Sequence, residues 1–133
     1  MSLNSNLQNG LFVFVGGGTG CVLRYFLGLL GSNLSTNIPV STLVANILGC
    51  FIIGIFFSLC TSMINVSQEI KLLVMIGFCG GLTTFSTFSL ELITLMAQSK
   101  ILALGYAFCS VICCLIAVVV GICVGGSFFK YGT

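Results

Sequence analysis

Residues 77–89 read GFCGGLTTFSTFS and lie near the middle of an apolar run that extends from Ile70 to Met96. The run is long enough to cross a bilayer as a helix, which takes about 20 mostly apolar residues. Two adjacent glycines followed by β-branched, hydroxylated residues weaken a continuous helix at this point. The sequence therefore predicts a membrane-spanning segment whose helix is broken near the midplane of the bilayer.

Three other runs have the length and apolar character of membrane spans: Leu11 to Leu30, Val40 to Leu59, and Ile101 to Phe129. Short polar segments at 32–39, 61–69 and 98–100 separate the four runs. An unpaired backbone amide in hydrocarbon costs several kcal/mol, and strand-like alternation is absent, so the spans must be helices. We predict an all-α membrane protein with four transmembrane helices, the third broken, in a single transmembrane domain over 1–133.

Composition excludes several classes of function. Hydrophobic residues make up 58% of the 133-residue chain and charged residues 5%, whereas about a quarter of an ordinary soluble domain is charged. The charges are scattered singly, so no nucleic-acid partner is expected. Eight cysteines without a CxxC pair, in a chain without histidine, are interpreted as small apolar residues and not as zinc ligands. The lack of histidine and of paired acids also argues against an enzyme.

Two charged residues, Arg24 and Glu91, fall well inside the predicted spans, away from their first residues. Such groups usually face a partner, a cavity or the interface. Arg24 either snorkels to the headgroups or meets a partner, whereas Glu91 is too short to snorkel far. Lysine and arginine counts, which set orientation, tie at two on each side: Lys71 and Lys130 against Arg24 and Lys100. The tie permits insertion in both orientations and hence an antiparallel dimer.

Polar and aromatic residues of the spans suggest a path for a small anion. On a helix that follows the break, Phe85 and Phe88 share one face, with Ser86 and Ser89 in a hydroxyl stripe beside them. Ring edges and hydroxyl groups can replace part of an anion's hydration shell, although lipid contact also explains phenylalanines. Asn46 serves either as interhelical contact or as part of a polar pathway.

Two further features bear on this path. Tyr106 and Ser110 lie one helical turn apart in the fourth span and could extend a polar lane, although packing explains them equally well. A broken helix also leaves carbonyl groups at one end, which attract cations, and amide hydrogens at the other, which attract anions.

The runs 16–25 (GGGTGCVLRY), 41–49 (STLVANILG) and 77–91 (GFCGGLTTFSTFSLE) together resemble the fluoride channels of the CrcB/Fluc family. The resemblance covers nearly the whole chain. It implies an antiparallel, dual-topology homodimer with two fluoride pores, although some relatives pair two different chains. By position, the implied pore residues are Asn46, Phe85, Phe88, Ser86 and Ser89, with Tyr106 and Ser110 in the less similar fourth span.

The resemblance also implies a structural sodium ion at the centre of the dimer interface, bound by the backbone carbonyls of Gly80 and Thr83. Arg24 matches the arginine of the family's first helix, and Glu91 matches the acid that follows the phenylalanine motif. We therefore expect a passive, fluoride-selective channel of the inner (plasma) membrane that exports fluoride and relieves its toxicity. The alternative is a small dual-topology, proton-coupled exporter of cationic compounds, which needs an acid in the first span. Residues 11–30 contain none.

Overall fold

A computed structural model describes residues 3–32, 38–62 and 66–130, and all regular elements in these ranges are helical. The elements are α1 (Leu3–Ser32), α2 (Val40–Ser62), α3 (Gln68–Lys71), the π-helix η1 (Leu72–Cys79), α4 (Gly80–Leu82), α5 (Phe85–Gln98) and α6 (Lys100–Lys130). Four helical stretches are long and apolar enough to cross a membrane: Asn4–Ser32, Val40–Ser62, Gln68–Gln98 and Lys100–Ser127. The predicted four-helix membrane fold is confirmed.

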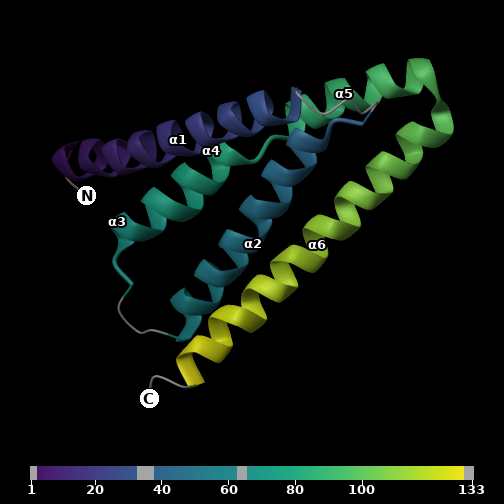
Figure 1. The fold of residues 1–133 in the computed structure, drawn as a ribbon. Helices are drawn as coiled ribbons and strands as arrows, with labels where there is room; N and C mark the ends of the chain where they lie inside the picture. Colours follow the sequence, from purple (N-terminus) through teal and green to yellow (C-terminus); the bar gives the residue numbers. More distant parts are fainter. Residues whose placement is uncertain (1–2, 33–37, 63–65, 131–133) are drawn as a thin grey trace.

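The helices associate mainly in two pairs (Figure 1). The first pair is α1 with the stretch formed by α3, η1 and α4, and the second is α2 with α6. Beyond the break, α5 runs away from α1 and packs against the beginning of α6. The break thus lies where the third span passes from one helix pair to the other.

Glycines allow both pairs to pack backbone against backbone. A methyl group at Gly20 or Gly81 would strike a backbone carbonyl oxygen of the facing helix, and so would one at Gly54 or Gly121 between α2 and α6. Since lipid tails are as apolar as side chains, close packing of this kind is a main source of helix association in membranes. These glycines allow the close approach of the paired helices.

The helix of the third span stops after the glycines, not at them. Gly80 and Gly81 are helical, and the chain becomes extended at Thr83 (φ −81°, ψ 153°) and Thr84 (φ −150°, ψ 121°) before α5 begins at Phe85. The threonine side chains bond to nearby backbone groups, which offers the chain an alternative to the helical hydrogen bonds. The predicted break is therefore confirmed, while the weak point lies at the two threonines.

Two other features differ from the sequence-based expectation. The first helix begins at Leu3, eight residues before Leu11, because hydropathy detects where a span enters hydrocarbon and not where its helix starts. The π-helical stretch at Leu72–Cys79 was not predicted at all. Of the predicted turns, 98–100 shortens to Ser99 alone, and parts of the other two, 33–37 and 63–65, lie outside the described residues.

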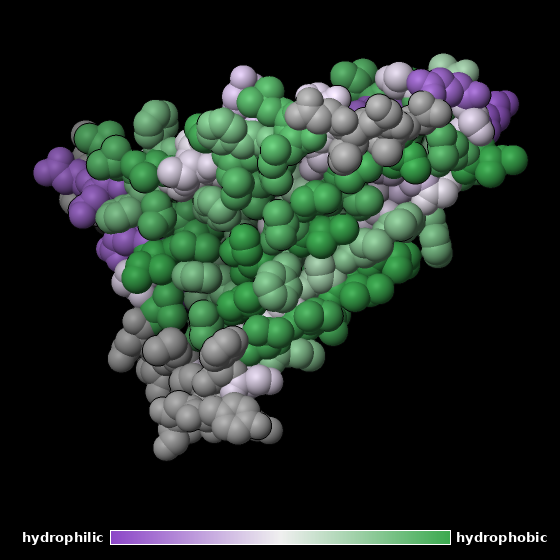
Figure 2. Space-filling model, viewed as in Figure 1, coloured by the Kyte–Doolittle hydropathy of each residue, from purple (hydrophilic) through white to green (hydrophobic). Residues whose placement is uncertain are grey.

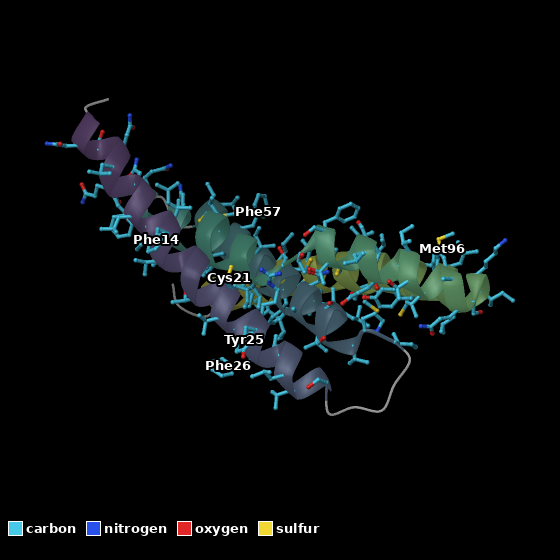
Figure 3. All side chains as sticks on the ribbon, turned by 90° about the horizontal axis from the view of Figure 1, so that it is seen from above. Phe14, Cys21, Tyr25, Phe26, Phe57 and Met96 are labelled. Atoms are coloured by element: carbon cyan, nitrogen blue, oxygen red, sulfur yellow. The ribbon has the colours of Figure 1, made fainter. Side chains whose placement is uncertain are left out.

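The surface agrees with burial in a bilayer. Figure 2 shows hydrophobic residues across the middle of the visible face, with hydrophilic ones over the beginning of α1 at the left and over the α5–α6 turn at the upper right. Phe14, Tyr25 and Phe26 of α1 point away from the other helices (Figure 3) and are 76%, 63% and 54% exposed. Such an apolar outer face requires lipid or another protein chain around it.

Candidate ion pathway at the helix break

Asn46 holds the break through both polar atoms of its side chain. The Thr84 backbone N–H donates to Asn46 Oδ1 at 2.8 Å, and Asn46 Nδ2 donates to the Thr84 carbonyl oxygen at 3.2 Å. The amide therefore joins α2 to the extended segment, which is the interhelical role that the sequence left open. An amide NH₂ has two hydrogens, so one donor position remains for another acceptor.

These bonds divert the donors that two carbonyl groups would have in an unbroken helix. The helical partner of the Gly80 carbonyl would be the Thr84 N–H, four residues on, which instead donates to Asn46. The partner of the Thr83 carbonyl would be the Thr87 N–H, which instead donates to Thr84 Oγ1 at 3.2 Å. Both carbonyl oxygens thus lose their helical donor and can accept from another source.

Arg24 binds the carbonyl group between these two. Its Nε donates to the Gly81 carbonyl oxygen at 3.1 Å, and its Nη2 lies 3.7 Å from Cys21 Sγ. The Gly81 carbonyl is at the end of α4, where helix carbonyls lack intrahelical donors and carry partial negative charge. Arg24 therefore turns toward the break and does not snorkel to the headgroups.

The other side of the break is the amino-terminal end of α5. Thr84 is the N-cap, and the N–H groups of Phe85 and Ser86 belong to the first turn, which has no preceding carbonyls within the helix. This end of the helix carries partial positive charge and suits an anion. The predicted serine stripe bonds locally: Ser89 Oγ donates to the Phe85 carbonyl at 2.8 Å, and Ser86 Oγ lies 3.3 Å from Thr84 Oγ1.

The two predicted pore phenylalanines have very different environments. Phe88 is 9% exposed and Phe85 is 79% exposed. Their ring centroids are 5.7 Å apart, and the Phe88 ring lies 5.5 Å from the ring of Tyr106 on α6. The three rings form a continuous aromatic row from the interior of the chain to its surface.

A cavity of about 350 Å³ opens beside the break and gathers several of the predicted pore residues. Its lining includes Asn46, Phe85, Phe88 and Ser110. The Ser110 hydroxyl is buried and meets no hydrogen-bond partner among the residues that the structure describes. The predicted Ser86, Ser89 and Tyr106 do not line this cavity, so the structure brings together only part of the predicted set.

A second cavity, of about 260 Å³, lies on another side of Thr84 and holds both intramembrane charges, Arg24 and Glu91. Glu91 accepts hydrogen bonds from Thr42 Oγ1 at 2.7 Å and from the Tyr106 hydroxyl at 3.3 Å. The carboxylate therefore has partners from both α2 and α6.

Sequence reasoning missed three threonines at this site, Thr42, Thr84 and Thr87, all of which line the second cavity. Thr42 precedes Asn46 by one helical turn, and this spacing places the two on one face of α2. The pairing of Thr42 with Glu91, 49 residues away, has no signal in a single sequence.

Comparisons with known proteins agree with this architecture. Residues 11–122 match the family described as CrcB-like protein, Camphor Resistance (CrcB). The chain is similar to proteins called fluoride-specific ion channel FluC. The one from Escherichia coli O17:K52:H18 (strain UMN026) is 47% identical over 105 residues, covering 79% of this chain and 80% of the relative.

Two further relatives carry the same name. The one from Escherichia fergusonii is 46% identical over 106 residues, or 80% of this chain and 81% of the relative. The one from Escherichia coli strain K12 is 49% identical over 94 residues, or 71% of this chain and 74% of the relative. With four membrane-length helices and a family match over most of its length, this chain belongs to the CrcB-like family.

Proposed function

We propose that this protein is a passive, fluoride-selective channel of the bacterial inner membrane that carries fluoride out of the cytoplasm. Its relatives in Escherichia are named as fluoride-specific ion channels, which also argues for a channel and against an enzyme. The observation that carries the proposal is the helix break at Thr83–Thr84, whose amide end adjoins a cavity lined by Asn46 and the phenylalanines. Broken backbone at membrane depth is tolerated where it lines a cavity.

Fluoride must lose water to enter the cavity beside the break, which we call the lane. Hydrogen-bond donors of the protein then replace the lost water. Candidates are the remaining N–H of Asn46, the first-turn amides of α5, and the unpartnered Ser110 hydroxyl. The edges of the Phe85 and Phe88 rings carry partial positive charge and add weaker contacts. A small, strong acceptor gains most from such donors, so the lane favours fluoride over chloride.

The direction of transport follows from the membrane potential. When a single negative charge leaves a cell whose interior is 100 mV negative, its free energy falls by about 2.3 kcal/mol. No coupled ion is needed for export. Ser86 and Ser89 join the lane when their hydroxyls rotate away from Thr84 Oγ1 and the Phe85 carbonyl, to which they now lie close.

The channel is proposed to be an antiparallel, dual-topology homodimer in which this single domain is one half. Phe85 is 79% exposed, so in one chain the aromatic row is open on one side and needs another wall. Gly80 is exposed as well, and a methyl group there would meet nothing within 4 Å in this chain. Its glycine is therefore unexplained by packing within the chain, whereas the close approach of a second copy would explain it.

A sodium ion at the dimer interface fits the carbonyl groups of Gly80 and Thr83. Both have lost their helical donors to Asn46 and Thr84, and carbonyl oxygens are suitable ligands for a hard cation. When bound, the ion would supply positive charge that holds the ends of the two α4 helices together. Replacing sodium with a large organic cation should then stop conduction, whereas unchanged flux would count against the site.

The rival function, proton-coupled export of cations, gains no support. Helix α1 contains no acidic residue, and Glu91, the one acid in the middle of a span, is hydrogen-bonded to Thr42 and Tyr106. The names of the relatives likewise refer to fluoride.

The test is fluoride efflux from liposomes that contain the purified protein, measured with a fluoride electrode. Phe88→Ile and Phe85→Ile should each lower the initial rate by about tenfold or more, equivalent to about 1.4 kcal/mol in the barrier. Phe14→Ile, on the outer face of α1, serves as the matched control and should conduct normally. Full flux in both pore variants would remove the aromatic rings from the mechanism.

A further inference from the structure

Two of the eight cysteines stand at the proposed ion lane. Cys50 on α2 and Cys114 on α6 line the same cavity as Asn46, Phe88 and Ser110. Both are half-buried and free. Each lies one helical turn before a residue of the close backbone contact between α2 and α6, Cys50 before Gly54 and Cys114 before Val118, so the two thiols face the same helix–helix seam. Neither thiol has a part in the transport of fluoride as proposed above.

We propose that Cys50 and Cys114 form a binding site for a soft, two-coordinate divalent cation of the mercuric type. Thiolates select soft metals, whereas zinc in proteins is bound by three or four ligands. No cluster of three or more potential metal ligands occurs among the described residues, so the pair suits a metal that is satisfied by two sulfurs. The site thus distinguishes mercury from zinc by the number of ligands that each metal requires.

The charge balance also favours a divalent ion. Binding replaces two S–H bonds by two S–Hg bonds and releases two protons to water, so Hg²⁺ with two thiolates forms a neutral complex. A monovalent ion such as Ag⁺ with two thiolates would leave a negative charge. Because an isolated charge in a low-dielectric site is costly, the neutral mercuric complex is preferred.

The cavity has room for the metal and its two sulfurs. It measures about 350 Å³ and is lined mostly by apolar side chains, among which a neutral mercury–thiolate complex is favoured over a charged one. A metal bridge between α2 and α6 at this point would fill the lane that Asn46 and Phe88 also line. Inhibition of fluoride efflux by the metal follows, and this consequence rests on the proposed function.

A second thiol pair provides a matched control. The sulfurs of Cys109 and Cys113 lie 3.7 Å apart one turn from each other on α6. Neither residue lines the cavity. Mercury bound to this pair would sit away from the proposed lane and should not obstruct it.

The first experiment measures binding alone. Purified protein is titrated with mercuric chloride, and the ultraviolet charge-transfer band of mercury–thiolate bonds and the intact mass are recorded. A variant that retains only Cys50 and Cys114, with serine at the other six positions, should bind about one mercuric ion per chain with two-thiolate coordination. In the natural background, Cys50→Ser and Cys114→Ser should each remove this equivalent, and an unchanged stoichiometry in both would overturn the site.

The second experiment measures block. Mercuric chloride should stop fluoride efflux from liposomes, and dithiothreitol should restore it. The efflux rate of each variant after mercury is compared with its own rate before mercury. Efflux through the double variant Cys109→Ser/Cys113→Ser should still be blocked by mercury, whereas efflux through Cys114→Ser should not. Sensitivity that follows Cys109 and Cys113 would overturn the block. Failure of the proposed function is separate, because it would appear as no efflux before mercury is added.

Discussion

Replacing Asn46 by leucine tests whether its amide holds the helix break. Leucine has a similar size but cannot pair with the backbone of Thr84, which is 9% exposed. The Thr84 N–H would lose its acceptor at 2.8 Å, and the carbonyl its donor at 3.2 Å. We expect the variant to be less stable and to conduct fluoride poorly, because the segment between α4 and α5 is no longer fixed to α2.

The size of the effect distinguishes this role from ordinary helix contact. An orphaned, buried N–H costs about 1–3 kcal/mol, and the lost bond to the carbonyl, which can still accept within α5, about 0.5–1 kcal/mol. The sum is about 1.5–4 kcal/mol. An ordinary interhelical hydrogen bond in a membrane contributes about 0.6 kcal/mol on average, since the unfolded chain also finds partners.

Reversible unfolding in mixed detergent micelles gives the free energy, and a fluoride electrode gives the flux. Thr61→Val is the matched control: it removes a hydroxyl from α2 whose bonds within the described part of the chain go to Phe57 and Ser58 of the same helix. A loss of about 0.6 kcal/mol or less for Asn46→Leu, with normal flux, would refute the view that Asn46 holds the break.

Three further predictions concern the packing and charges around the break. Gly81→Ala should destabilise the fold by about 1–3 kcal/mol through overpacking, since its methyl group would strike the Gly17 carbonyl, whereas Gly18→Ala, with open space around it, should not. Equal free energies of unfolding for the two variants would contradict the close approach of α1 and α4. Arg24→Met should lower stability by about 1.5–3 kcal/mol, the contribution of a hydrogen bond from a charged group. Thermal unfolding of Arg24→Met and of Arg24→Lys, which keeps the positive charge, would show whether the bond to the Gly81 carbonyl or the charge alone is responsible. Glu91→Gln should keep the contacts with Thr42 and Tyr106 and so retain the melting temperature, whereas Glu91→Leu should lower it.

Much of the fold could be predicted from the sequence, because the membrane restricts the choices. Four apolar runs and the requirement to pair every backbone amide leave few structures other than four helices. The break was also predictable, because the third run alone combines adjacent glycines with a cluster of threonines and serines. Its position two residues past the glycines depends on Asn46 and on the threonine side chains, and those contacts cross between spans.

The candidate site was only partly predictable for the same reason. Asn46, Phe88 and Ser110 do line one cavity, but nothing in the sequence indicates that Phe85 is exposed while Phe88 is buried. The choice of partner for Arg24, the Gly81 carbonyl, depends on the close packing of α1 against α4. Pairings between helices, such as Thr42 with Glu91, require the tertiary structure.

The most direct test of the account is whether the membrane potential alone moves fluoride through the purified protein. Liposomes loaded with potassium fluoride, at equal pH on both sides, are given a potential with valinomycin, and fluoride and chloride release are recorded. The account predicts rapid fluoride efflux that follows the potential, with chloride slower by at least about tenfold, or about 1.4 kcal/mol. Efflux that requires a proton gradient, or equal release of both halides, would contradict a passive lane built from amide, hydroxyl and ring-edge donors.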